Sequence, residues 1–224
     1  MEETGGDGLI ISGHGDDDGC ASRDVTVKDC VFSRNYRQGL SVISAVDLLV
    51  ESCVFERTNG TMPMAGVDLE PDRPHQQLSN VTFTDCSFIG NAGAGFQIIA
   101  SAFSNEMAPI SVLLDGCYSR ASTQACEGQW CTRESRSIDG AAGVGLEVCN
   151  KAPASALLTI RNVTLKGTAL PPAHWPEPWL TIPPVALGAC GNRYHPANTI
   201  DATFGGFGGL VFSNLSVADA VARQ

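Results

Sequence analysis

The chain has 224 residues, of which 43% are hydrophobic and 17% charged, and its formal net charge is -10. This length and apolar content suit one domain with a hydrophobic core and exclude an intrinsically disordered chain. The acidic balance excludes a protein that binds nucleic acid through general positive charge, and no apolar run is long enough to cross a bilayer.

The first ten residues, MEETGGDGLI, are polar and acidic and do not form a secretory signal. The first strand-like run begins at Leu9, already in register with the later repeats. We therefore expect the chain to be a fragment that lacks its N-terminal cap. The following loop, ISGHGDDDGC at 11–20, is either a solvated acidic turn or a cation site formed by Asp16, Asp17 and Asp18.

Two sets of short, similar runs alternate along the chain. One set begins with glycine: GLIIS (8–12), GLSVI (39–43), GVDLE (66–70), GFQII (95–99) and GLEVC (145–149), with PVALG (184–188) as a variant. The other set comprises VTVKDCVF (25–32), LLVESCVF (48–55), VTFTDCSF (81–88), SVLLDGCY (111–118), LLTIRNVTL (157–165) and LVFSNLSV (210–217). In the second set Cys30, Cys53, Cys86 and Cys117 form one column, which we expect Asn162 and Asn214 to continue as an internal ladder.

Regular short strands that recur every 20–50 residues or so are typical of a solenoid. Apolar residues alternate in each run, so each strand buries one face, and stacking of successive coils completes the core. The sequence predicts an all-β parallel β-helix of about six coils, forming a single domain over 1–224. Loop insertions interrupt the repeat near 118–142 and 168–184.

The segment NYRQGLSVISAVDLLVESCVFERTNGTMPMAGVDLEPDRP resembles the right-handed parallel β-helix family, often called pectin-lyase-like. The resemblance extends from Gly8 to Val217. It implies a right-handed coil and a secreted, polysaccharide-active protein located outside the cell or at its surface. The fold serves lyases, hydrolases, epimerases and adhesins, so the resemblance does not choose among these activities.

Alignment of the glycine-led runs predicts which residues point away from the core. One outward column comprises Ile10, Ser41, Asp68, Gln97, Glu147 and Ala186. Glu70 follows Asp68 on the same face, about 6.5–7 Å along the strand. Glu147 lies two coils from Asp68, about 9–10 Å away, near the upper end of the carboxylate separation in inverting glycosidases. We therefore expect Asp68, Glu70 and Glu147 to be exposed catalytic candidates.

The resemblance implies that this outer face forms the substrate groove, with Gln97 contributing to binding. A uronide lyase needs a positive group to neutralise the substrate carboxylate and a base to remove a proton. Arg37, which is also a catalytic candidate, and Arg73, Tyr36 and His75 offer these groups. Calcium prefers oxygen ligands, and Asp68, Glu70 and Asp72 offer a calcium site.

The two loop insertions carry further candidates. Cys126 and Cys131 are close enough in CEGQWC to form a disulfide bond, which would indicate an oxidising compartment. In the proline-rich insertion Trp175 and Trp179 are candidates for stacking on sugar rings.

Three interpretations remain open at this stage. The first is an enzyme that acts on an extracellular acidic polysaccharide by β-elimination or hydrolysis. The second is a non-catalytic module for glycan binding, adhesion or structure. The third is a fragment without activity of its own. The GHG and DDD motifs occur in an order that differs from polygalacturonases of this fold, so that mechanism is not transferred, and the oligomeric state is left open.

Overall fold

The computed structural model describes residues 1–13, 20–100, 110–120, 146–150, 157–166, 185–188 and 210–218. Their regular elements are all strands, which form three parallel six-stranded sheets. No helix able to cross a membrane occurs in these ranges.

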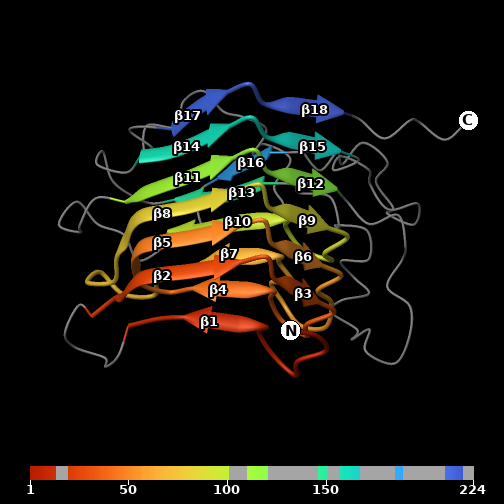
Figure 1. Ribbon diagram of the computed structural model, residues 1–224, viewed down its shortest axis with the longest axis horizontal. Helices are drawn as coiled ribbons and strands as arrows, with labels where there is room; N and C mark the ends of the chain where they lie inside the picture. The colour runs from red at the N-terminus through yellow and green to blue at the C-terminus, as the bar shows by residue number, and fades with distance from the viewer. Residues whose placement is uncertain are drawn as a thin grey trace, which may run out of the picture.

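Each sheet takes every third strand of the chain (Figure 1). Sheet 1 comprises β1 (Leu9–Ile11), β4 (Leu40–Val42), β7 (Val67–Leu69), β10 (Phe96–Ala100), β13 (Leu146–Asn150) and β16 (Val185–Gly188). Sheet 2 comprises β2 (Ser22–Lys28), β5 (Ala45–Glu51), β8 (Leu78–Thr84), β11 (Ser111–Asp115), β14 (Leu157–Arg161) and β17 (Leu210–Ser213). Sheet 3 comprises β3 (Val31–Ser33), β6 (Val54–Glu56), β9 (Ser87–Ile89), β12 (Tyr118–Arg120), β15 (Thr164–Lys166) and β18 (Ser216–Ala218).

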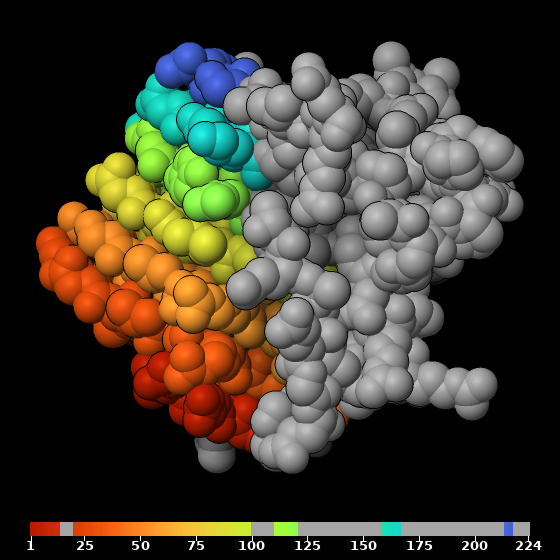
Figure 2. All heavy atoms as spheres, turned by 90° about the vertical axis from the view of Figure 1, so that its right-hand side faces the viewer, coloured from red at the N-terminus to blue at the C-terminus, as the bar shows by residue number. Residues whose placement is uncertain are grey.

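One strand from each sheet makes a coil, and six coils stack in chain order. The space-filling view shows the same order from red to blue along the stack (Figure 2). The prediction of a parallel β-helix with about six coils is confirmed. Each run of the second predicted set contributes two strands, because a sharp corner divides it between sheets 2 and 3.

The core lies between the three sheets and is filled by the alternate apolar residues of each strand. Identical positions on successive coils stack on one another, so side chains of one kind form columns. Phe32, Phe55 and Phe88 form such a column in sheet 3, with ring centroids 4.9 Å and 5.8 Å apart. These columns fix the register of the coils and therefore the register of the polar residues on the opposite face of each strand.

The hydrogen bonds at the corner between sheets 2 and 3 contradict the prediction that Asn162 and Asn214 continue the cysteine column. The residue after Val163 donates its amide hydrogen to the Cys117 carbonyl, and the residue after Leu215 donates to the Val163 carbonyl. Val163 and Leu215, rather than Asn162 and Asn214, therefore continue the cysteine column.

The two asparagines occupy the preceding corner position instead. Asn162 and Asn214 have φ values of 54° and 51°, in the left-handed region that asparagine tolerates well. Both are exposed, and Asn214 Nδ2 donates to Asn162 Oδ1 at 2.9 Å. The expected asparagine ladder exists, but it lies on the surface.

The glycines that precede β4 and β7 in sheet 1 allow a close approach between coils. A Cβ atom on Gly39 would lie 2.5 Å from the Gly66 carbonyl oxygen, and one on Gly66 would lie 2.6 Å from the Gly95 carbonyl oxygen. Any larger residue would push the coils apart at this corner. The residues on either side of these glycines are thus held in close contact across coils, and they form the candidate site.

Candidate functional site

The predicted outward column of sheet 1 is present. Strand pairing aligns Ile10, Ser41, Asp68, Gln97, Glu147 and Ala186 as direct neighbours on six successive strands. Their strand neighbours Leu40, Val67 and Phe96 lie in the core, so the column faces away from it. Glu147 is placed by its backbone, two strands from Asp68.

The expectation that Asp68 is exposed is wrong. Asp68 has 0% of its surface exposed, Ser41 has 1% and Gln97 has 2%, although all three face away from the core. Glu70, which was also expected to be exposed, has a side chain that is 26% exposed. Burial on an outward face requires side chains from other segments to lie across the strand.

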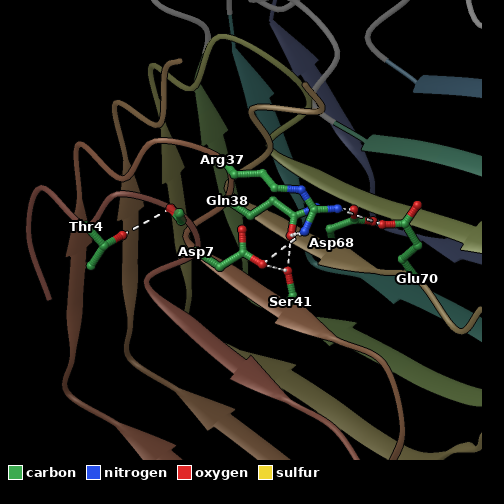
Figure 3. A network of polar contacts seen from close by, with 8 residues as sticks. Thr4, Asp7, Arg37, Gln38, Ser41, Asp68 and Glu70 are labelled. Carbon is green, nitrogen blue, oxygen red and sulfur yellow. Dashed lines mark hydrogen bonds and ion pairs between the residues drawn. The ribbon is translucent and has the colours of Figure 1, made fainter. Parts of the chain in front are cut away.

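Arg37 and Gln38, in the turn before β4, provide part of this cover (Figure 3). Gln38 is fully buried, and its Nε2 donates a hydrogen bond to Asp68 Oδ2. The Arg37 side chain passes over the strands to Glu70, with Nη2 3.4 Å from Glu70 Oε2. The sheet thus carries a second, polar layer at β4 and β7.

Asp7 completes this layer from the first coil. Its side chain is 3% exposed, and its Oδ2 lies 3.1 Å from Arg37 Nη1 and accepts a hydrogen bond of 2.7 Å from Ser41 Oγ. Ser41 Oγ also contacts Gln38 Oε1. We call Asp7, Arg37, Gln38, Ser41, Asp68 and Glu70 the carboxylate network.

The repeat itself brings Asp7 to this place. Asp7 and Gln38 each precede the glycine that begins a strand of sheet 1, and the amide after Asp7 donates to the Gln38 carbonyl at 2.9 Å. On the next two coils the same position holds Ala65 and Ala94, both buried. The polar layer at this corner therefore belongs to the first two coils.

The pKa of Asp68 is raised well above its usual range. Burial is the largest cause, followed by the charge of Glu70 and a side-chain hydrogen bond with Glu70. Gln97 and Arg37 act in the opposite direction and only offset part of the rise. A hydrogen bond between two carboxyl groups requires a proton, so the neutral form of Asp68 is favoured.

The two carboxyl oxygens of Asp68 differ in their contacts. Oδ2 accepts from Gln38, whereas Oδ1 is buried and accepts no hydrogen bond. Gln97, the residue of β10 paired directly with Asp68, lowers the pKa of Asp68, and its Nε2 is also buried. Asp68 Oδ1 and Gln97 Nε2 are thus both buried on neighbouring strands.

Tyr36, Asp72 and Arg73, three other predicted residues, lie between strands. A Cβ atom on Gly60 would lie 2.3 Å from Tyr36 Cδ2, so the Tyr36 ring packs against the Gly60 backbone. Asp72 and Arg73 are exposed in a turn, where their amides donate to Gln76 Oε1 at 2.6 Å and 3.0 Å.

The predicted calcium ligands Asp68, Glu70 and Asp72 do not form one cluster. Asp72 is exposed while Asp68 is buried, and the described ranges hold no group of three His, Cys, Asp or Glu arranged for a metal ion. Calcium binding by Asp68, Glu70 and Asp72 stays a prediction. Trp175, Trp179, the Cys126–Cys131 pair and the 16–18 aspartates lie outside the described residues.

Sequence reasoning missed Asp7, Gln38 and Ser41 as members of one network. Ser41 could have been found from the sequence, because it shares the outward column with Asp68. For Asp7 and Gln38 the signal is their shared position before the glycine. A polar residue at a buried corner of a solenoid needs a partner on a neighbouring coil.

A comparison with protein families defines the class. Residues 5–108 match the family model described as a right-handed β-helix region. This part of the chain is similar to the right-handed β-helix family, and the same three parallel sheets continue in the later described strands. The network, from Asp7 to Glu70, lies wholly within the matched residues.

Among curated proteins, the chain is similar to the uncharacterized protein YclG of Bacillus subtilis (strain 168). The two are 29% identical over 99 residues, which cover 40% of this chain and 17% of YclG. The chain thus corresponds to less than a fifth of that relative. No solved structure matches the chain significantly.

Proposed function

We propose that the protein acts on an extracellular polysaccharide and cleaves it by acid–base hydrolysis along the outer face of sheet 1. The observation that carries this proposal is the buried carboxyl group of Asp68, whose pKa is raised by burial and by Glu70. A carboxyl group kept protonated near neutral pH is the usual general acid of glycosidic bond cleavage.

The carboxyl spacing assigns the roles. Glu70 raises the pKa of Asp68, so its carboxylate favours the protonated form of Asp68. Glu147 lies two strands from Asp68, about 9–10 Å by strand spacing, near the upper end of the inverting range. We therefore assign Asp68 as general acid, Glu147 as general base for water, and Glu70 as the partner that keeps the proton on Asp68.

The ion pairs of Arg37 favour hydrolysis over β-elimination. A lyase uses a positive group to neutralise the uronate carboxylate of its substrate. Arg37 is already paired with Asp7 and Glu70. Its charge is offset within the network, which supports a reaction that does not require it for that purpose.

A second candidate function is non-catalytic glycan binding. It is supported by the 0% exposure of Asp68, which no substrate atom can reach unless the covering side chains move. In that case Asp68 has a purely structural role, and the outer face binds sugars through Glu70 and Arg37.

The test is incubation with a panel of acidic and neutral polysaccharides, with and without calcium, followed by mass spectrometry of the products. Products that have gained water are expected, and Asp68→Asn should lower their rate by about 10²–10⁴-fold, the usual contribution of a general acid. Asp47→Asn is the matched control, because Asp47 is exposed on β5 and accepts a hydrogen bond from Asn80.

The alternatives give different results. Unsaturated uronide ends would indicate a lyase and overturn the hydrolytic assignment, and a strict calcium requirement would revive the predicted metal site. Binding without any product from a folded sample would favour the non-catalytic module.

A further inference from the structure

Four asparagines of the chain begin an Asn-x-Ser/Thr sequence: Asn59, Asn80, Asn162 and Asn214. This sequence, with any middle residue except proline, is the acceptor for N-linked glycans on secreted proteins. The structure separates the four by their surroundings. Asn80 lies on β8, and Asn162 and Asn214 lie at the corners that follow β14 and β17 (Figure 1). These three asparagines are exposed, whereas Asn59 is half-buried.

In each of the three exposed sequences the middle residue faces the core. Val81 is 1% exposed and Val163 is 3% exposed, and Leu215 packs against the core cluster. The residues on either side therefore lie at the outer surface. The hydroxyl residues of the three sequences are half-buried or exposed: Thr82, Thr164 and Ser216. Both residues that define the acceptor thus lie on the same side of the chain as solvent.

The three side-chain amides share one hydrogen-bond pattern. Each Nδ2 donates to the coil before it: Asn80 to Asp47 Oδ1 at 2.7 Å, Asn162 to Asp115 Oδ1 at 2.8 Å, and Asn214 to Asn162 Oδ1 at 2.9 Å. An amide nitrogen carries two hydrogens, and this bond uses one of them. A sugar can replace the second hydrogen while the contact between coils is retained.

Asn59 offers a different environment for the same sequence. Its side-chain oxygen Oδ1 is buried, and its middle residue Gly60 packs against the Tyr36 ring. A glycan on Asn59 would have to begin below the surface of the folded protein. Exposure therefore favours three of the four acceptor sequences.

We propose that Asn80, Asn162 and Asn214 carry N-linked glycans. The donor is an oligosaccharide linked to a lipid through a diphosphate. The asparagine Nδ2 loses one proton and bonds to the anomeric carbon of the first sugar, while the bond from that carbon to the diphosphate oxygen breaks and the lipid diphosphate leaves. This inference rests on the proposed function only in taking the protein to be secreted.

The surface position of the asparagine ladder is what permits this modification. An internal ladder, which the sequence predicted for Asn162 and Asn214, would leave no room for a sugar. All three asparagines lie on sheet 2 or at its corner with sheet 3, and none lies on sheet 1. The glycans would therefore cover a different side from the outer face that carries Asp68 and Glu147.

The test measures the occupancy of each asparagine. The full chain is secreted from a eukaryotic host behind a cleavable leader, and its peptides are treated with peptide N-glycosidase in heavy-oxygen water. This treatment converts each glycosylated asparagine to a labelled aspartate, which mass spectrometry counts. We expect most copies to be modified at Asn80, Asn162 and Asn214, and an occupancy at least fivefold lower at Asn59.

Variants at the hydroxyl residue separate acceptor chemistry from folding. Asn162 has a φ of 54° and donates to Asp115, so replacing Asn162 itself would disturb the corner. Thr164→Ala retains Asn162 and should lower its occupancy at least tenfold while Asn214 stays modified. Thr164→Ser is the matched control, because it retains a hydroxyl group, and it should leave Asn162 modified.

The peptide counts decide the proposal. Unmodified Asn162 and Asn214 in the secreted protein, or in the protein from its natural source, overturn it. Equal occupancy at Asn59 also overturns it, because exposure would then not select the sites. Occupied asparagines without any polysaccharide product would support the glycan sites and refute the proposed hydrolysis. Hydrolysis by a secreted but unmodified protein would do the reverse.

Discussion

If Asp68 is protonated in the folded protein, the pH dependence of stability can be predicted and tested without any substrate. In the Asp68→Asn variant the side-chain amide can donate to Glu70 and its oxygen can accept from Gln38, as the protonated acid does. The variant therefore mimics the neutral form of Asp68 at every pH. At about pH 4, where the wild-type group is neutral when folded, we expect the two proteins to have similar free energies of unfolding.

The sign of the pH dependence follows from linkage. The pKa of Asp68 is raised in the folded protein, so above the unfolded pKa of about 3.9 the folded state binds one more proton than the unfolded state. The wild-type free energy of unfolding must then fall relative to the variant by up to about 1.4 kcal/mol per pH unit. The decline ends at the folded pKa of the Asp68–Glu70 pair, which shares the extra proton.

The assay is urea unfolding of both proteins at half-unit steps between pH 4 and pH 8. We expect the stability difference to grow in favour of Asp68→Asn as the pH rises. Asp47→Asn shows how stability responds to the loss of one exposed carboxylate. If the difference between wild type and Asp68→Asn is constant across the range, Asp68 does not retain its proton, and the acid role assigned to it is refuted.

Two further predictions concern the core columns. Phe55→Ala removes a fully buried ring that lies between two other phenylalanine rings. We expect it to lower the free energy of unfolding by about 3–5 kcal/mol, measured by denaturant titration. A loss below about 1 kcal/mol would contradict the packing described. Burial raises the pKa of the Cys53 thiol to about 11, whereas Cys20 is exposed. In the native protein at pH 8, iodoacetamide should therefore modify Cys20 and not Cys53, which peptide mass spectrometry would show. Equal labelling of the two cysteines would contradict the burial of the cysteine column.

The repeat made most of the fold predictable. The alternation of apolar residues and the recurring glycine are local signals, and together they gave the strands, the coil count and the alignment of Ser41, Asp68 and Gln97. The cysteine column was misassigned at its end because the corner uses one residue in the left-handed region, as at Asn162, and the sequence does not mark this position uniquely.

The burial of Asp68 was not predictable in the same way. Part of its cover comes from Arg37 and Gln38, about 30 residues earlier, whose side chains lie over the strand. Alternation within a strand tells which residues leave the core, but it does not tell what lies above them. The network depends on contacts between coils at a corner, and the local signal for these contacts is the position of Asp7 and Gln38 before the glycine.

The stacking of coils has a consequence for how the site is inherited and engineered. In a solenoid each coil contacts only its neighbours, so stability and local opening are properties of adjacent coils rather than of the whole molecule. The network and its neighbour Gln97 draw on four successive coils, from Asp7 to Gln97. Together with Glu147 on β13 they form one unit of adjacent coils, so coils beyond β13 can be added, lost or exchanged without removing any residue assigned to the site.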